Sequence, residues 1–210
     1  MPIKHACFIS YRRGNDKDRL TPRLITDLYN ALTDEVGQYL EEAVYLDEQF
    51  LNGGQYVDKT IARALCESVC LIVVFTPRYL SSSHPYCARE LCAMRHIEKR
   101  RFEALKLPEE KTNGLIITIV YRGMEELPDE LKDRLCHNFE AFDERQPKLR
   151  KNEKYYPQIR EIAKYIHDRY KSLNGLSEDP CGNCADFELP RAESEEVKTL
   201  LRDSIHRYVR

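Results

Sequence analysis

Long apolar runs are missing from this 210-residue sequence, in which no stretch of about eighteen apolar residues occurs. That absence excludes a predicted transmembrane helix. Charge of one sign is also scarce, because the net charge of −2 gives no general attraction for nucleic acid or for an anionic membrane. The first residues, Met1-Pro2-Ile3-Lys4, lack the apolar core of a signal peptide. We therefore expect a cytoplasmic protein that binds no nucleic acid and no membrane.

A second Cys-x-x-Cys pair beside Cys181-Gly-Asn-Cys184 is absent, although the chain has eight cysteines. A single pair is a weak signal for zinc, because a structural zinc site takes four ligands, and we expect no metal. Most other cysteines lie in apolar or helical segments: Cys7, Cys66, Cys70, Cys87 and Cys92. We expect these to be buried free thiols, as is usual in a reducing compartment.

Short apolar runs alternate along the chain with helical patterns. The runs predict strands at residues 6–11, 43–46, 69–75 and 115–121, and the third is the most hydrophobic and so the most central. Apolar residues at helical spacing predict helices that start at Thr21-Pro22, near Tyr56 and near Tyr86, and a last one over about 156–173. The charged segment 122–153 carries no clear pattern.

This alternation predicts an α/β domain with a central parallel sheet and helices on both faces. Ligands of such sheets bind at the carboxyl ends of the strands. Three of these ends carry polar loops, at residues 11–13, 47–54 and 76–86. We expect the functional site at this edge. The basic cluster Lys99-Arg100-Arg101 predicts only a solvated helix end.

Residues 174–210 differ in character from the rest of the chain. A turn-rich segment that contains Cys181 and Cys184 is followed by Ser194, a predicted N-cap for an amphipathic helix. We assign residues 1–173 to the domain and 174–210 to a C-terminal extension that packs on the domain or on a partner chain.

Three segments resemble the signature boxes of the TIR (Toll/interleukin-1 receptor) domain family. The first is Phe8-Ile9-Ser10-Tyr11-Arg12-Arg13. The second is Tyr45-Leu46-Asp47, Leu51-Asn52-Gly53-Gly54 and Asp58-Lys59 with Ile61, which resemble the family's second strand, its BB loop and the helix that follows. The third is Phe75-Thr76-Pro77-Arg78-Tyr79-Leu80 with Tyr86-Cys87-Ala88-Arg89-Glu90-Leu91, similar to the family's S-P-x-Y and W-C-x-x-E-L, although tyrosine replaces the tryptophan. The boxes stand in the family's order.

The resemblance implies a flavodoxin-like TIR fold and, more narrowly, the bacterial NAD⁺-cleaving branch, which includes Thoeris-type anti-phage proteins. In that branch the residue matching Glu90 is essential, so Glu90 is implied as the catalytic carboxylate. Cleavage of the nicotinamide–ribose bond passes through an oxocarbenium-like state that a carboxylate stabilises. NAD⁺ is then the substrate, and no cofactor is expected. The product, ADP-ribose or a cyclic isomer that acts on a separate effector, stays open.

Side chains of the same loops are candidates for binding the substrate. Arg12 and Arg13 are suited to hold the pyrophosphate through forked hydrogen bonds. Tyr11, Tyr56 and Tyr86 are candidates for stacking on the nicotinamide or adenine ring.

The BB loop contributes two more predicted substrate-binding residues, Asn52 and Gly54. Its glycines allow the backbone to approach a ligand closely, and Asn52 stands where an NAD⁺-cleaving member of the family has a carboxylate. The resemblance also implies head-to-tail self-association, in which the BB loop of one copy completes the pocket of the next.

Two alternatives stay open at this point. Taken alone, Glu90 also fits a glutamate at a helix N-terminus or an ion pair with Arg89 or Arg12. The chain as a whole also fits a non-catalytic adaptor that binds other TIR domains, although a scaffold needs no carboxylate at position 90. We interpret Ser83-His84 as a helix cap rather than part of a hydrolase triad.

Overall fold

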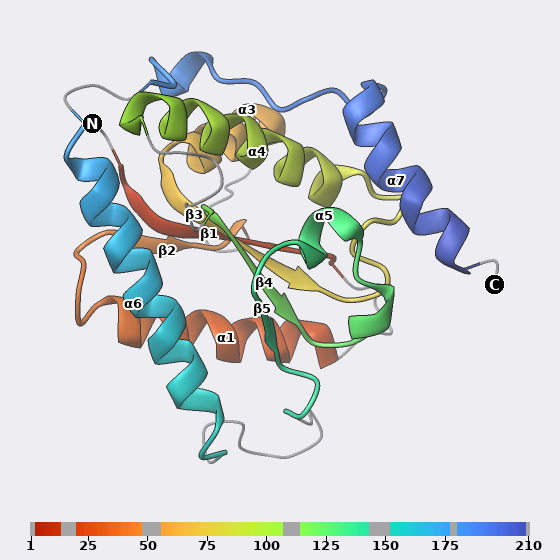
Figure 1. The fold of residues 1–210 in the computed structure, drawn as a ribbon, viewed down its shortest axis with the longest axis horizontal. Helices are drawn as coiled ribbons and strands as arrows, with labels where there is room; N and C mark the ends of the chain where they lie inside the picture. The colour runs from red at the N-terminus through yellow and green to blue at the C-terminus, as the bar shows by residue number, and fades with distance from the viewer. Residues whose placement is uncertain are drawn as a thin grey trace.

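A parallel sheet of five strands forms the centre of the computed structural model, which describes residues 3–13, 20–47, 56–106, 114–142, 152–176 and 180–208 (Figure 1). The strands are β1 (His5–Tyr11), β2 (Ala43–Tyr45), β3 (Ser68–Phe75), β4 (Ile116–Val120) and β5 (Cys136–Asn138). Their order is β2-β1-β3-β4-β5, with every pair parallel. β3 is buried along its whole length and lies at the centre, as predicted. The order is that of flavodoxin-like folds, which confirms the predicted fold class.

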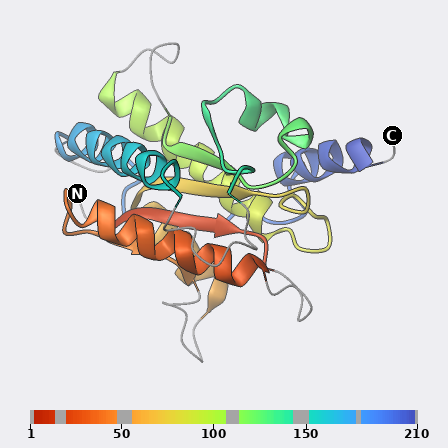
Figure 2. The ribbon, with the colours of Figure 1, turned by 90° about the horizontal axis from the view of Figure 1, so that it is seen from below.

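Helices cover both faces of the sheet (Figures 1 and 2). On one face α1 (Leu20–Val36) packs against α6 (Tyr155–Asn174), and on the other α3 (Val57–Cys66) packs against α4 (Tyr86–Leu105). Each helix buries one apolar stripe; in α6 this stripe includes Ile159, Ile162 and Ile166, all fully buried at helical spacing. No helix in the described parts of the chain combines the length and the apolar character needed to cross a membrane.

The segment that the sequence left unassigned contains three short elements: η2 (Met124–Glu126), α5 (Asp129–Lys132) and the edge strand β5. The strand has only three residues, and none of them is fully buried. It therefore lacks the apolar run by which the other strands were predicted. Leu127, Leu131 and Phe139 anchor the segment to the core instead.

The far end of α4 is buried, and the prediction of a solvated cluster there is wrong for Arg101. Its guanidinium donates to the carbonyl oxygens of Cys66 at 2.7 Å and Ser68 at 2.6 Å. Cys66 ends α3, so Arg101 satisfies a carbonyl group that the helix leaves unpaired. Arg101 follows Met94 and Ile97 at helical spacing, which turns it toward the interior. Lys99 and Arg100 are exposed, as predicted.

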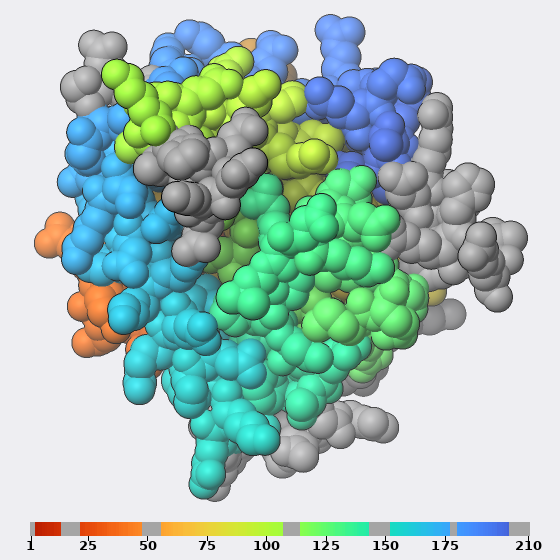
Figure 3. All heavy atoms as spheres, in the orientation of Figure 1, coloured from red at the N-terminus to blue at the C-terminus, as the bar shows by residue number. Residues whose placement is uncertain are grey.

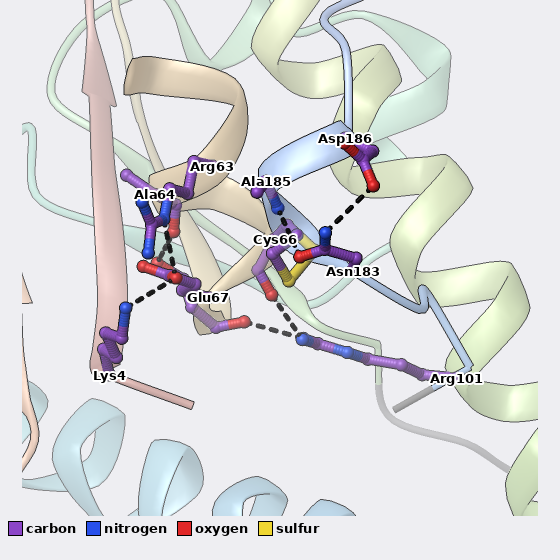
Figure 4. Close-up of a disulfide and its surroundings, with 11 residues drawn as sticks. Lys4, Arg63, Ala64, Cys66, Glu67, Arg101, Asn183, Ala185 and Asp186 are labelled. Atoms are coloured by element: carbon purple, nitrogen blue, oxygen red, sulfur yellow. Dashed lines mark hydrogen bonds and ion pairs between the residues drawn. A yellow bond between two sulfur atoms is a disulfide. The ribbon is translucent and has the colours of Figure 1, made fainter. Parts of the chain in front are cut away.

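A disulfide joins Cys66, at the end of α3, to Cys184 in the C-terminal extension (Figure 4). The prediction of a free thiol is therefore wrong for Cys66, whereas Cys7, Cys70, Cys87 and Cys92 are buried thiols. The two bonded cysteines lie 118 positions apart in sequence, with Cα atoms 5.5 Å apart. Periodicity predicts which cysteines are buried, but not which of them the fold brings together. Cys181 and Cys184 do not form a dithiol pair.

The C-terminal extension lies along the outside of α3 and α4. Its short helix η4 (Cys184–Asp186) contacts α3, and α7 (Glu195–Tyr208) contacts α4 (Figure 1). Asn183 caps η4, since its Oδ1 accepts a hydrogen bond from the Ala185 amide at 3.1 Å. The cap expected from Ser194 is wrong: its Oγ is buried and has no hydrogen-bond partner among the described residues.

Candidate active site

The candidate site lies where β1 and β3 end beside each other. After β1 the chain passes to α1 on one face of the sheet, and after β3 it passes to α4 on the other. The carboxyl edge at such a reversal of direction is where ligands bind in parallel sheets. The first turns of α4 enter this edge, so the described parts of the three predicted loops do converge here.

Glu90, in the second turn of α4, contacts the end of β1. Ser10 Oγ donates to Glu90 Oε2 at 2.5 Å, and the hydroxyl of Tyr79 lies 2.7 Å from the same Ser10 oxygen. The single Ser10 proton goes to Glu90, so Tyr79 donates to Ser10. All three residues are buried, with exposed fractions of 6%, 1% and 0% for Glu90, Ser10 and Tyr79. Among the described residues, the Ser10 hydroxyl is thus the hydrogen-bond partner of this carboxyl, and Tyr79 supports it from behind.

Burial raises the pKa of Glu90 to about 8, and the nearby charge of Asp47 adds to the increase. The hydrogen bond from Ser10 and the guanidinium groups of Arg13 and Arg89 act in the opposite direction. A carboxyl group with this pKa is mostly protonated at pH 7, and a positive charge placed beside it favours ionisation. Strongly shifted carboxyls at the ligand-binding edge of a fold are candidates for function.

Two ion pairs flank Glu90. Arg13 Nη2 lies 2.6 Å from Asp47 Oδ2, which links the end of β1 to the end of β2. Arg89 Nη2 lies 2.7 Å from Asp58 Oδ2, which links α4 to α3. Arg89 is thus engaged by Asp58, and no cation of the described residues forms an ion pair with Glu90. The ion-pair explanation for Glu90 gains no support.

Tyr86 lies one turn before Glu90 on α4, at the spacing that places two side chains on one side of a helix. Its hydroxyl donates to Asp58 Oδ1 at 3.0 Å, and the Arg89 guanidinium lies 5.1 Å from the centre of its ring. Even so, 41% of Tyr86 is exposed. The predicted stacking residue is therefore held beside the carboxyl group with part of its ring uncovered.

The other predicted binding residues lie at different depths. Arg12 is half-buried; Nη1 donates to the Arg13 carbonyl oxygen at 2.9 Å, and the buried Nε has no partner among the described residues. An unpaired guanidinium donor suits an anionic ligand. Tyr11 is only 8% exposed and offers little ring surface, whereas Tyr56 is 80% exposed at the start of α3. The BB-loop predictions, Asn52 and Gly54, lie outside the described residues.

Residues 7–151 match the family model described as the TIR domain. The chain belongs to the TIR domain family. No individual curated protein matches it. The family includes NAD⁺ hydrolases and non-catalytic members, and its domains associate with other TIR domains. α6 and the C-terminal extension follow the matched region, although α6 packs on β1 and β3 of this TIR domain.

Ser10, Tyr79 and Asp58 belong to the segments that resemble the family boxes, but none of the three was predicted to bind or to catalyse; all three contribute to this edge of the TIR domain. One signal was present for Glu90 itself. Cys87, Glu90, Met94 and Ile97 follow each other at helical spacing, which places a carboxyl on an otherwise apolar stripe. The sequence pattern therefore predicts that Glu90 is buried, and a buried carboxyl group needs polar partners.

The Ser83-His84 pair precedes α4 in this TIR domain, and among the described residues His84 has no carboxylate partner. Ser83 Oγ lies 2.9 Å from His84 Nδ1 at an exposed position, and Pro85 occupies the cap position of α4 without a side-chain cap, so the expected capping role is wrong. Cys87 is the buried thiol of the same turn, and burial raises its pKa well above the usual range, which keeps it protonated. Among the described residues, no cluster of three His, Cys, Asp or Glu side chains could hold a metal ion.

A broad hollow of the described surface lies away from Glu90. It is lined by residues of α4, β4, α5, α6 and α7, and it contains none of the predicted site residues. Figure 3 shows the face on which α4, α6 and the green segment around α5 come to the surface. Its lining mixes charges of both signs, among them Arg95, Arg134 and Glu161. Concavity alone therefore does not mark the site of this TIR domain.

Proposed function

We propose that this TIR domain cleaves the nicotinamide–ribose bond of NAD⁺, with Glu90 as the catalytic carboxylate. The observation that carries the proposal is a buried carboxyl group at the carboxyl edge of the sheet, held by the Ser10 hydroxyl and left without a cationic partner among the described residues. A carboxyl with a purely structural role at such a depth is normally neutralised by a paired cation. An uncompensated one is suited to stabilise positive charge on a substrate.

The chemistry needs few groups from the protein. As the bond breaks, positive charge grows on the ribose, and a carboxylate beside it stabilises the oxocarbenium-like transition state. Nicotinamide leaves as a neutral ring from a cationic one, so no general acid is required. The hydrogen bond from Ser10 fixes one oxygen of Glu90 and leaves the other available to the ribose.

The cationic nicotinamide ring also supplies the charge that Glu90 lacks. With a pKa of about 8, the carboxyl of the ligand-free protein is mostly protonated at neutral pH. A bound positive charge favours the carboxylate form, so the substrate assists in generating its own catalytic group. The reaction is then expected to need the ionised form of Glu90, and activity is expected to rise with pH.

The remaining binding roles rest on position and chemistry. The half-buried guanidinium of Arg12 and the partly exposed Arg13 are suited to the pyrophosphate. The exposed rings of Tyr86 and Tyr56 are suited to stack on the nicotinamide or adenine base, with Tyr11 as part of the wall. We propose that Asn52 and Gly54 of the BB loop complete the site.

The expected product is ADP-ribose when water captures the ribosyl cation, or a cyclic isomer when a group of the adenosine half does so. We propose that the product is an immune signal in bacterial anti-phage defence and acts on a separate effector. Self-association through the BB loop would make activity depend on protein concentration.

One observation favours a second function, a non-catalytic adaptor that binds other TIR domains. Tyr56 and Val57 expose 80% and 44% of their surface at the start of α3, directly after the BB loop. Exposed apolar side chains of this kind are suited to a protein interface.

Nicotinamide release from NAD⁺ separates the two functions. The wild-type chain at high concentration is compared with Glu90→Gln, which keeps the size of the side chain but cannot carry its charge. We expect release from the wild type and a loss of at least about 10³-fold in the variant. Glu103→Gln, on the exposed side of the same helix, is the matched control and should retain full activity. If the wild type releases no nicotinamide even when crowded into assemblies, the adaptor function is the better one.

A further inference from the structure

The C-terminal extension touches the candidate site through one short segment, residues 180–194, which we call the C-terminal strap. Two contacts anchor the strap to the TIR domain. Near its start, Cys184 is bonded to Cys66 of α3. Near its end, the carbonyl oxygen of Pro190 accepts a hydrogen bond from Arg89 Nε of α4 at 2.7 Å. The strap therefore bridges the two helices on this face of the sheet, from outside the region that matches the TIR family.

The strap lies closely against the domain between these anchors. Cys184 is 4% exposed and Leu189 is 7% exposed. Asn183 closes the turn at its start through hydrogen bonds to Ala185 and Asp186. The Pro190 carbonyl is thus presented to Arg89 by a segment with its own internal bonds and its own buried side chains.

Arg89 connects the strap to the mouth of the site. Its guanidinium is planar, with donors in a fixed arrangement, so holding Nε in one direction also directs Nη2. Nη2 is bound to Asp58 Oδ2 at 2.7 Å, and the guanidinium lies over the ring of Tyr86. Arg89 is only 9% exposed and has little freedom to reorient.

Tyr86 is the end point of this chain of contacts. Asp58 holds its hydroxyl, Arg89 covers its ring, and each of these two residues also holds the other. Removing the strap from Arg89 would release the guanidinium and, through it, both constraints on the ring. Since Tyr86 stands one turn from Glu90, a change in its ring would alter how a planar base is received beside the carboxyl group.

We propose that the C-terminal strap is a positioning element of the active site: through Arg89 it holds the Asp58–Tyr86 pair in the arrangement that binds the aromatic base of the substrate. The proposal rests on the proposed function. It gives the extension a role in substrate affinity rather than in the bond-breaking step, because the two anchors of the strap are Cys66 and Arg89, and none of its described residues forms a hydrogen bond with Glu90.

Two variants of the full-length chain test the strap. Cys66→Ala/Cys184→Ala removes the covalent anchor, and Arg89→Lys keeps the positive charge but loses the fork that joins Pro190, Asp58 and Tyr86. We expect the KM for NAD⁺ to rise roughly three- to tenfold in both, with kcat changed by less than about twofold. Val197→Ala is the matched control, because it removes buried packing between α7 and α4 without touching Arg89. It should lower the melting temperature and leave KM unchanged.

Amide hydrogen exchange supplies a readout that does not need catalysis. In both strap variants we expect faster exchange at residues 57–60 and 86–90 than in the wild type and in Val197→Ala. Faster exchange in a chain that never cleaves NAD⁺ would uphold the strap's positioning of these residues and overturn the proposed function. Unchanged exchange together with an unchanged KM would overturn the strap's role while the NAD⁺-cleaving function stood. A KM that rises equally in Val197→Ala would reduce the strap to a source of stability.

Discussion

Two buried glutamates on α4, about two turns apart, have opposite electrostatic surroundings. Glu90 and Glu98 are 6% and 7% exposed. The carboxyl of Glu90 meets the hydroxyl of Ser10, and no cation of the described residues pairs with it. Glu98 instead receives both terminal nitrogens of Arg134, at 2.8 and 2.6 Å, and the backbone amide of Leu115.

The surroundings of Glu98 are built for this pairing. The Arg134 fork matches the two carboxylate oxygens, the strongest geometry that an arginine offers. Gly114 lets the pair approach the backbone closely, because a Cβ at this position would overlap both the Arg134 guanidinium and the Glu98 carboxylate. The Gly114 carbonyl oxygen in turn accepts from the Tyr165 hydroxyl at 2.6 Å.

Burial alone therefore does not distinguish a structural glutamate from a candidate functional one. Both carboxyls lose their contact with water, and only Glu98 recovers the loss through a paired charge. Glu90 is left with a raised pKa at the edge where parallel sheets bind their ligands. A compensated buried charge indicates structure, and an uncompensated one at a ligand-binding edge indicates function.

Breaking the Glu98 pair should have the largest effect on stability. Arg134→Met leaves the Glu98 carboxylate buried without its cation, which should cost about 3–5 kcal/mol of unfolding free energy. Urea unfolding at neutral pH measures the loss. Arg160→Met is the matched control, because Arg160 is exposed and lies 3.6 Å from Glu35; its loss should cost about 1 kcal/mol or less. Equal losses in the two variants would contradict the contrast between a buried pair and a surface pair.

Glu90→Gln should change the free energy of unfolding in the opposite direction and stabilise the folded chain. The pKa of Glu90 is about 8 in the folded chain and 4.5 when unperturbed, so between these values the folded state binds more protons than the unfolded state. Its contribution to stability therefore falls as pH rises through this window, by about 1.4 kcal/mol per pH unit at most.

The Gln variant should lose this slope and become more stable than the wild type near pH 8. Unfolding free energies measured at several pH values between about 5 and 9 test the expectation. Glu103→Gln, exposed on the same helix, should keep the wild-type slope. A slope that persists in Glu90→Gln would mean that another group causes it.

Ser10→Ala should produce the smallest effect and the most specific one. The Ser10 hydrogen bond lowers the pKa of Glu90, so its removal should raise that pKa further, by an amount that corresponds to about 1 kcal/mol. For a reaction that needs the carboxylate, kcat/KM rises with pH up to the pKa of the free enzyme. The midpoint should lie near 8 in the wild type and higher in Ser10→Ala.

Tyr79→Phe serves as the control for that shift. It removes the donor to Ser10 but leaves the bond from Ser10 to Glu90, so the midpoint of the pH profile should move less than in Ser10→Ala. If the midpoints coincide in the wild type and both variants, the Ser10 hydroxyl does not influence the pKa of Glu90, and the prediction is wrong.

Much of the frame could be predicted from the sequence. The buried strands are predictable because a strand covered on both faces must be apolar along most of its length, as residues 69–75 are. The helices follow from apolar stripes, and their alternation with strands leaves few topologies. Once the order of strands is known, the edge that holds Glu90 follows. Strand β5 escaped prediction because three partly exposed residues at the sheet's edge carry no such signature.

Hydrogen-bond and disulfide partners that lie far apart in the chain could not be predicted from the sequence. Ser10 and Glu90 are 80 positions apart, Arg89 and Pro190 are 101 apart, and Cys66 and Cys184 are 118 apart. Periodicity assigns a side chain to a face, but a hydrogen bond or a disulfide depends on which group the opposite element presents there. Arg101 shows the same limit. Its charge predicts exposure to solvent, but the side chain is buried because it donates to the free carbonyl oxygens at and just after the end of α3.

The architecture of this protein and the ligand-binding edge of its sheet follow from the order of residues alone, because apolar spacing acts locally along each element. Three other features arise only when the chain folds: Glu90 is a buried acid with no ion-paired cation among the described residues, Glu98 is a buried acid paired with Arg134, and the C-terminal strap reaches Arg89. The ionisation of a carboxyl depends on burial and on neighbours from every direction, and these exist only once the chain has folded.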